Sequence, residues 1–261
     1  MTCSEISSSR ADGPKGTICL LPNLLTTISL FSGFYAIVSA INGRYFNAAV
    51  ALLISAVFDG LDGRVARMTG TASLFGKEYD SLCDLVAFGV APGVIAYLWA
   101  LEAYGRYGWL AAFLYVATTA LRLARFNTQD GDSTGNFTGL PCPAAAATVA
   151  TTILFCNFFK VGPATIGLVV LAMVYTLSYL MVSSIKYMSF KHPETTRAKK
   201  FQMMVAMVLL IMVVATEPQV TLFVIAAIYV LSGPFGSMYR LLVPSSCSQE
   251  LEGRDKPICR P

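Results

Sequence analysis

Four aspartates lie close together in an otherwise apolar part of the sequence. Asp59 and Asp62 are three residues apart, which on an α-helix places both side chains on one face. Asp80 and Asp84 are four residues apart, and this spacing also places both side chains on one helical face. Two helices joined by a turn near residues 69–73 would therefore direct four carboxylates into one small volume.

Such a cluster of like charges requires compensation, because the carboxylates repel one another. A single Asp at the centre of a membrane helix costs about 2.5–3.5 kcal/mol. A divalent cation or protonation makes the cluster tolerable, and a set of oxygen ligands favours Mg²⁺ or Mn²⁺ together with substrate phosphates. The alternative is a set of solvated aspartates at the ends of two helices.

The residues between the two aspartate pairs are suited to binding a phosphorylated ligand. Gly63 and Gly76 have no side chain, so a nucleotide or a neighbouring backbone can come close. Arg67 can reach a phosphate or orient an aspartate. Ser73 lies in the expected turn, where its hydroxyl can donate a hydrogen bond to a nucleotide.

The whole stretch follows the pattern D-x2-D-G-x2-A-R-x8-G-x3-D-x3-D, with eight fixed residues in 26 positions. It resembles the signature of the CDP-alcohol phosphotransferase family. The resemblance implies that the four aspartates bind the metal and that Asp84 also acts as general base. It further implies direct transfer without a covalent enzyme intermediate, and a homodimer. Family members carry a Pro-Asn pair near the nucleotide, which implies that Asn23 contacts the CDP group; the alternative is an ordinary helix start in which Asn23 is a local cap.

Two further stretches resemble the phosphatidylserine synthase branch of this family. They are LRLARFN, ending at Asn127, and FTGLPCPAAA, beginning at Phe137. The resemblance implies phosphatidyl transfer from CDP-diacylglycerol to L-serine. Arg122 and Arg125 are three residues apart, so they can present a guanidinium pair to a serine carboxylate or a phosphate, with Asn127 beside them. Two snorkelling arginines at the membrane edge are the alternative.

Composition indicates an all-α, polytopic membrane protein. The chain is 55% hydrophobic and 13% charged, with mean hydropathy +0.61, whereas soluble domains are about 25% charged. Eight apolar runs are long enough to cross about 30 Å of hydrocarbon. They span residues 18–41, 45–66, 79–101, 107–127, 141–159, 163–185, 201–216 and 219–242. We therefore expect a membrane domain over 18–242, with polar segments at 1–17 and 243–261. The first run is expected to be a retained helix, because residues 1–17 lack a signal-peptide layout.

The distribution of basic residues predicts the orientation. With eight crossings, only Arg44, Arg106 and Lys160 lie on the side opposite the termini. Sixteen others share the side of the termini: Arg10, Lys15, Arg64, Arg67, Lys77, Arg122, Arg125, Lys186, Lys191, Arg197, Lys199, Lys200, Arg240, Arg254, Lys256 and Arg260. The positive-inside rule then places both termini and the aspartates, in a polar cavity, at the cytoplasmic face of the cell membrane. Anionic membrane lipids are expected partners and nucleic acid is not.

The same residues allow other functional interpretations. Glycerol 3-phosphate or an inositol compound can be the acceptor in the same family. Membrane prenyltransferases also use aspartates and Mg²⁺, but the fourth position after Asp62 is Ala66 where their pattern requires Asp. An ion-coupled transporter can carry carboxylates in its helices, although it would not need the register of Gly63, Arg67 and Gly76. The seven cysteines are scattered and are expected to be free thiols.

Overall fold

The computed structural model describes residues 15–69, 74–128, 139–183 and 216–242, and within these ranges every regular element is a helix. This confirms the all-α prediction. The helices are α1 (Lys15–Ile41), α2 (Tyr45–Thr69), α3 (Leu74–Asp84), α4 (Ala91–Ala96), α5 (Arg106–Thr128), α6 (Cys142–Phe158), α7 (Pro163–Val182) and α9 (Pro218–Leu242). Two π-helical segments, η1 (Leu85–Val90) and η2 (Tyr97–Leu101), and the short 3₁₀ helix η3 (Glu102–Tyr104) extend the third span. The expected span 201–216 and both terminal segments lie essentially outside the described residues.

The helix of the third span begins before its apolar run. The turn expected near residues 69–73 agrees with α2 ending at Thr69 and α3 beginning at Leu74, whereas the apolar run was placed at 79–101. Asp80 therefore lies almost two turns inside the helix. Hydropathy indicates where a chain leaves the hydrocarbon layer and not where its helix ends. The first turns of α3 are polar, with Lys77 and Glu78 among their residues, and they nevertheless continue the helix.

Pro92 lies within this long helical span, where its missing N–H and its ring disturb an α-helix. The chain accommodates it by a wider helical turn. Residues 85–90 are π-helical, and the N–H of Ala91 bonds to the carbonyl of Val86, five residues back. The sequence predicts a kink at Pro92. In the structure, the residues before Pro92 form a π-helical turn.

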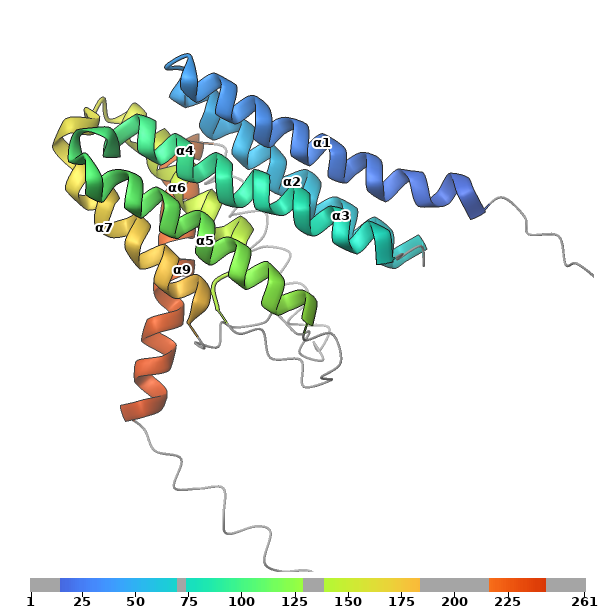
Figure 1. Ribbon diagram of the computed structural model, residues 1–261. Helices are drawn as coiled ribbons and strands as arrows, with labels where there is room; N and C mark the ends of the chain where they lie inside the picture. The colour runs from blue at the N-terminus through green and yellow to red at the C-terminus, as the bar shows by residue number, and fades with distance from the viewer. Residues whose placement is uncertain (1–14, 70–73, 129–138, 184–215, 243–261) are drawn as a thin grey trace, which may run out of the picture.

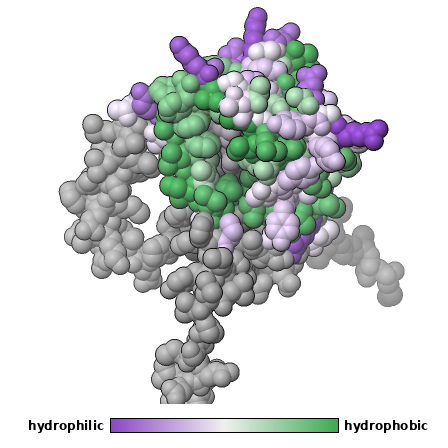
Figure 2. Space-filling view, turned by 90° about the vertical axis from the view of Figure 1, so that its left-hand side faces the viewer, coloured by the Kyte–Doolittle hydropathy of each residue, from purple (hydrophilic) through white to green (hydrophobic). Residues whose placement is uncertain are grey.

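Within the described ranges, three helices are long and apolar enough to cross a membrane: Pro22–Ile41, Phe75–Tyr104 and Pro163–Val182. Shorter apolar helices cover 142–158 and 218–234. Large apolar side chains are exposed on these helices, as at Phe31 (69% exposed) and Tyr179 (71%). Figure 2 shows hydrophobic side chains across the middle of one face and hydrophilic ones along its upper edge. An apolar band of this kind is the surface that lipid tails cover.

Small residues form the contact between the first two helices, as is usual when helices pack in lipid. Ala36 and Ala40 of α1 and Ala48 of α2 are fully buried. A side chain at Gly33 would meet the Cα of Ala87 at 2.8 Å, so α1 also approaches η1 closely. At these contacts, small side chains therefore allow α1 to lie close to α2 and to η1.

The helix α1 supports both helices that carry the aspartates. It packs along α2 and also against α3, whereas α2 and α3 make few direct contacts with each other. Figure 1 shows α1, α2 and α3 extending together to one side of the bundle, with α5, α6 and α7 at the other side. The relative position of the two aspartate pairs thus depends on α1.

Candidate active site

The structure brings three of the four aspartates into one cluster. Carboxylate oxygens of Asp59, Asp62 and Asp80 all lie within 4.8 Å of one another. The Asp62 side chain is buried, with 4% of its surface exposed, and the other two are half-buried. Two carboxylates come from the second half of α2 and one from α3, so the cluster exists only because these two helices are held side by side.

Asp84 lies beside this cluster. Its side chain lies against that of Asp59, across from α3 to α2. Asp84 is the last residue of α3, directly before the π-helical turn of η1. The fourth carboxylate is therefore next to the other three, but it stands at a different position along the helix axis from Asp80.

A divalent cation fits this donor set. The three carboxylates offer only oxygen, the ligand atom that Mg²⁺ and Mn²⁺ prefer. One oxygen, Oδ1 of Asp80, is buried and has no hydrogen-bond partner. A buried carboxylate oxygen without a partner carries the full cost of its lost hydration, and coordination to a cation removes that cost.

Thr26 on α1 contacts the cluster, and the sequence analysis did not identify it. Its hydroxyl is 2.8 Å from Oδ2 of Asp62 and 3.1 Å from the carbonyl of Pro22. The backbone N–H of Gly63 also bonds the Asp62 carboxylate. One signal in the sequence pointed to Thr26: it lies one helical turn after the Pro22-Asn23 pair and so shares their face of α1.

The residues expected to hold the nucleotide are placed differently. Gly63 is exposed, and a Cβ added there would meet nothing within 4 Å, so open space lies next to the cluster. Gly76 is half-buried in α3, and Asn23 is half-buried in α1, where its carbonyl accepts a hydrogen bond from Thr27. Arg67 belongs to the last turns of α2. Ser73 lies outside the described residues.

The two arginines of α5 differ in their surroundings. Arg122 is half-buried, and its Nη1 donates to the Cys142 Sγ at 3.2 Å. Its Nε is buried without a hydrogen-bond partner. Arg122 and Asp84 both act electrostatically on the buried Cys142 thiol. Arg125 is exposed. The expected guanidinium pair is therefore one inward and one outward arginine.

Asn127 is tied to the helix of Asp80. Its Nδ2 donates to the Ser81 Oγ at 3.0 Å, and the Ser81 hydroxyl lies 3.3 Å from the Asn127 Oδ1. Ser81 follows Asp80 directly. The sequence analysis expected Asn127 near the substrate, and the structure shows that it joins the end of α5 to α3.

Gly139, in the stretch before α6, has a structural reason to be glycine. Its φ is +85°, and a side chain there would meet the carbonyl oxygen of Met181 at 2.6 Å. The next residue, Leu140, donates its N–H to the carbonyl of Leu180 at 3.1 Å. This stretch therefore anchors the start of α6 to the end of α7.

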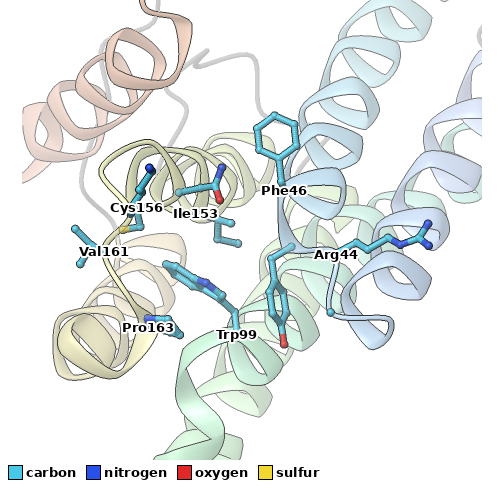
Figure 3. A pocket seen from close by; sticks show the side chains of 11 residues that line it. Arg44, Phe46, Trp99, Ile153, Cys156, Val161 and Pro163 are labelled. Carbon is cyan, nitrogen blue, oxygen red and sulfur yellow. The ribbon is translucent and has the colours of Figure 1, made fainter.

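A cavity of about 420 Å³ lies at the other end of the bundle. Its lining includes Tyr45 at the start of α2, Trp99 in η2 and Pro163 at the start of α7. Figure 3 shows Trp99 and Ile153 lining the cavity, while the Arg44 guanidinium points away from it. Along α2, Tyr45 and Asp62 are 17 residues apart, which corresponds to about 25 Å. This cavity is separate from the carboxylate cluster.

The fold and the carboxylate cluster are those of a membrane-embedded transferase, and the family model described as CDP-alcohol phosphatidyltransferase matches residues 19–177. The chain belongs to this family. It is 36% identical over 221 residues to the CDP-diacylglycerol–serine O-phosphatidyltransferase of Helicobacter pylori, covering 84% of this chain and 92% of that one. It is 39% identical over 169 residues to the archaetidylserine synthase of Methanothermobacter thermautotrophicus, covering 64% and 69%. The Bacillus subtilis CDP-diacylglycerol–serine O-phosphatidyltransferase is 33% identical over 171 residues, covering 66% and 91%.

Proposed function

We propose that this protein transfers the phosphatidyl group of CDP-diacylglycerol to the hydroxyl of L-serine, giving phosphatidylserine and CMP. The observation that carries the proposal is the cluster of Asp59, Asp62 and Asp80, in a chain similar along almost its whole length to an enzyme named for this reaction. Arg122, which contacts the Cys142 thiol on which Asp84 also acts, supports an acceptor that carries a negative charge.

The three clustered aspartates would hold a divalent cation, Mg²⁺ or Mn²⁺, with Asp84 as a further ligand. Such a cation neutralises charge on the diphosphate and on the departing phosphate. The aspartates themselves fix the place of the diphosphate relative to α2 and α3. The open space beside Gly63 is where the diphosphate and nucleotide would lie, contacted by Asn23, Arg67, Ser73 and Gly76.

In the reaction, the hydroxyl oxygen of serine attacks the β-phosphorus of CDP-diacylglycerol. The new bond joins the serine oxygen to this phosphorus, and the bond from the phosphorus to the bridging oxygen breaks. The bridging oxygen leaves with CMP. Asp84 accepts the proton of the serine hydroxyl, and Arg122 contacts the serine carboxylate or a phosphate. Arg125 and Asn127 lie on the same turns of α5 and contribute charge or positioning at the edge of the site.

The membrane arrangement follows from the same proposal. The chain crosses the cell membrane eight times, the membrane domain covers 18–242, and the segments 1–17 and 243–261 lie with the aspartates at the cytoplasmic face. The excess of basic residues on this side supports the orientation. A homodimer is proposed by analogy with the family alone.

The test is an acceptor panel with the purified full-length protein in lipid nanodiscs. CMP release from CDP-diacylglycerol is measured with Mg²⁺ or Mn²⁺ and with L-serine, glycerol 3-phosphate or inositol as the alcohol. Serine alone should stimulate release, and excess chelator should stop it. Stimulation by glycerol 3-phosphate or inositol without serine would show a different acceptor, and full release in chelator would contradict the cation site.

A further inference from the structure

The helix α1 contacts both aspartate-bearing helices through two consecutive threonines. The Thr26 hydroxyl lies 2.8 Å from the carboxylate of Asp62 on α2. The Thr27 hydroxyl lies 3.0 Å from the hydroxyl of Tyr79 on α3, the residue before Asp80. Neighbouring side chains of α1 thus hold one point on each helix that supplies carboxylates.

The position of these contacts matters because α2 and α3 make few direct contacts with each other. Contacts through α1 therefore contribute to the distance between Asp62 and Asp80. Thr26 is the one of the two threonines that contacts a clustered carboxylate itself, and it is buried, with 5% of its surface exposed. Its single proton has two acceptors within reach, and the carboxylate oxygen is closer than the Pro22 carbonyl.

We propose that Thr26 is a positioning residue, which orients the Asp62 carboxylate and thereby sets the affinity of the cluster for a divalent cation. The hydrogen bond to Oδ2 restricts rotation of the carboxylate and directs its other oxygen. This inference rests on the cation site proposed above. Partners that hold a metal ligand in this way typically change metal affinity by about 10–100-fold when removed.

The same helix pair provides a matched control. Ser32 also bonds from α1 to α2, with its hydroxyl 2.8 Å from the carbonyl of Ala51. It is buried at the same interface, but its partner lies 11 residues before Asp62 and is not a carboxylate. Loss of the Ser32 hydroxyl removes an interhelical hydrogen bond without touching the cluster.

The experiment compares Thr26→Val, Thr26→Ser and Ser32→Ala with the unmodified full-length protein in nanodiscs. Bound Mn²⁺ is titrated by electron paramagnetic resonance, alone and with CDP added as a soluble diphosphate. Thr26→Val should raise the Kd for Mn²⁺ by about 10–100-fold. Thr26→Ser keeps the hydroxyl and should stay within about threefold, as should Ser32→Ala.

Two results would overturn the positioning role of Thr26. One is an unchanged Kd in Thr26→Val when the unmodified protein binds Mn²⁺. The other is an equal rise in Kd for Thr26→Val and Ser32→Ala, which would show that interhelical packing alone is responsible. If the unmodified protein binds no Mn²⁺ under either condition, the cation site itself is wrong, and this outcome is distinct from the other two.

Discussion

Serine and threonine side chains are used differently in the two halves of the molecule. In α6 and α7, hydroxyls bond to carbonyls of their own helix, as Thr148 does to Ala144 and Ser178 to Val174. In α1 and α2, hydroxyls join one helix to the other. Ser29 lies 2.9 Å from the Ser55 hydroxyl, and Thr26 and Ser32 also reach across to α2.

The difference shows where the geometry of this protein is fixed. A hydroxyl that bonds its own helix is satisfied in an apolar interior but sets no relation between helices. In α5 and α6, hydroxyls reach other helices through methionine sulfur, a weak acceptor, as from Thr119 to Met181. Hydrogen bonds between α1 and α2 restrict the sliding and rotation of one helix against the other. These two helices must keep Asp59 and Asp62 at a fixed position relative to α3.

Each half also contributes a buried polar group that has no hydrogen-bond partner. Among the described residues, Oδ1 of Asp80 and Nε of Arg122 are buried without a hydrogen bond. The first belongs to one of the clustered aspartates, and the second belongs to α5, beside Cys142 of α6. Each leaves a strong donor or acceptor for a ligand.

The largest effect is expected at the carboxylates, where Asp80→Asn and Asp84→Asn should differ. Asp80→Asn removes a charged ligand from the cluster and should abolish turnover and weaken binding of the nucleotide lipid. Asp84→Asn should lower kcat by about 10²–10⁴, the usual contribution of a positioned general base, with CDP-diacylglycerol binding mostly retained. Single-turnover rates and lipid affinity are measured for both variants side by side.

The chemical similarity of Asp and Asn makes this pair informative. Both substitutions keep the shape of the side chain and remove its charge. A difference between the two variants therefore reflects the different role of each carboxylate. Equal loss of lipid binding in the two variants would mean that Asp84 acts chiefly as a metal ligand. The serine proton would then leave by another route.

The second-largest effect is expected in α5, where Arg122→Ala should raise the KM for serine or lower kcat by roughly 10–100-fold. A hydrogen bond to a charged partner is typically worth about 1.5–3 kcal/mol, and Arg122 is half-buried beside the site. Arg125→Ala is the matched substitution three residues along the same helix, and it should change either constant by less than about threefold, because Arg125 is exposed. Equal effects of the two would restore the guanidinium pair expected from spacing alone.

The cluster was predictable because helical spacing is fixed by backbone geometry: Asp59 with Asp62 and Asp80 with Asp84 share a face wherever their helices lie. The all-helical architecture was predictable because long apolar runs in a chain of this composition form membrane helices. The start of α3 at Leu74 follows the turn expected near residues 69–73 and not the apolar run that begins at residue 79, because a helix can continue into the polar layer. Thr26 was missed because its role depends on which face of α1 meets α2, and hydropathy along a uniformly apolar helix does not reveal that face.

The distinction between Arg122 and Arg125 also required the structure. Three residues of spacing place the arginines about 60° apart around the helix, enough to bury one and expose the other. Gly139 is a related case. Its place in a recognisable stretch indicated function, whereas its positive φ and its contact with Met181 show that the backbone requires glycine there.

The smallest effect is expected from the bond between α5 and α3. Asn127→Ala removes the reciprocal hydrogen bonds with Ser81, and hydrogen bonds between membrane helices average about 0.6 kcal/mol, with a maximum near 1.7. Activity should therefore fall by about three- to twentyfold, through a shift of α3 and of Asp80. Thr151→Val, which removes a hydroxyl bonded within α6, should leave activity unchanged within about twofold.

A double substitution decides whether Asn127 acts through Ser81 or on the substrate. If the two side chains act only through their shared bond, Ser81→Ala with Asn127→Ala should be no worse than either single change, since residues in one network are not additive. If Asn127 contacts serine or a phosphate, its loss should add to that of Ser81 and should raise the KM for serine more than it lowers kcat. Steady-state kinetics of the three variants at saturating cation distinguish the two results, because a shift of α3 acts on every substrate and a lost contact acts on one.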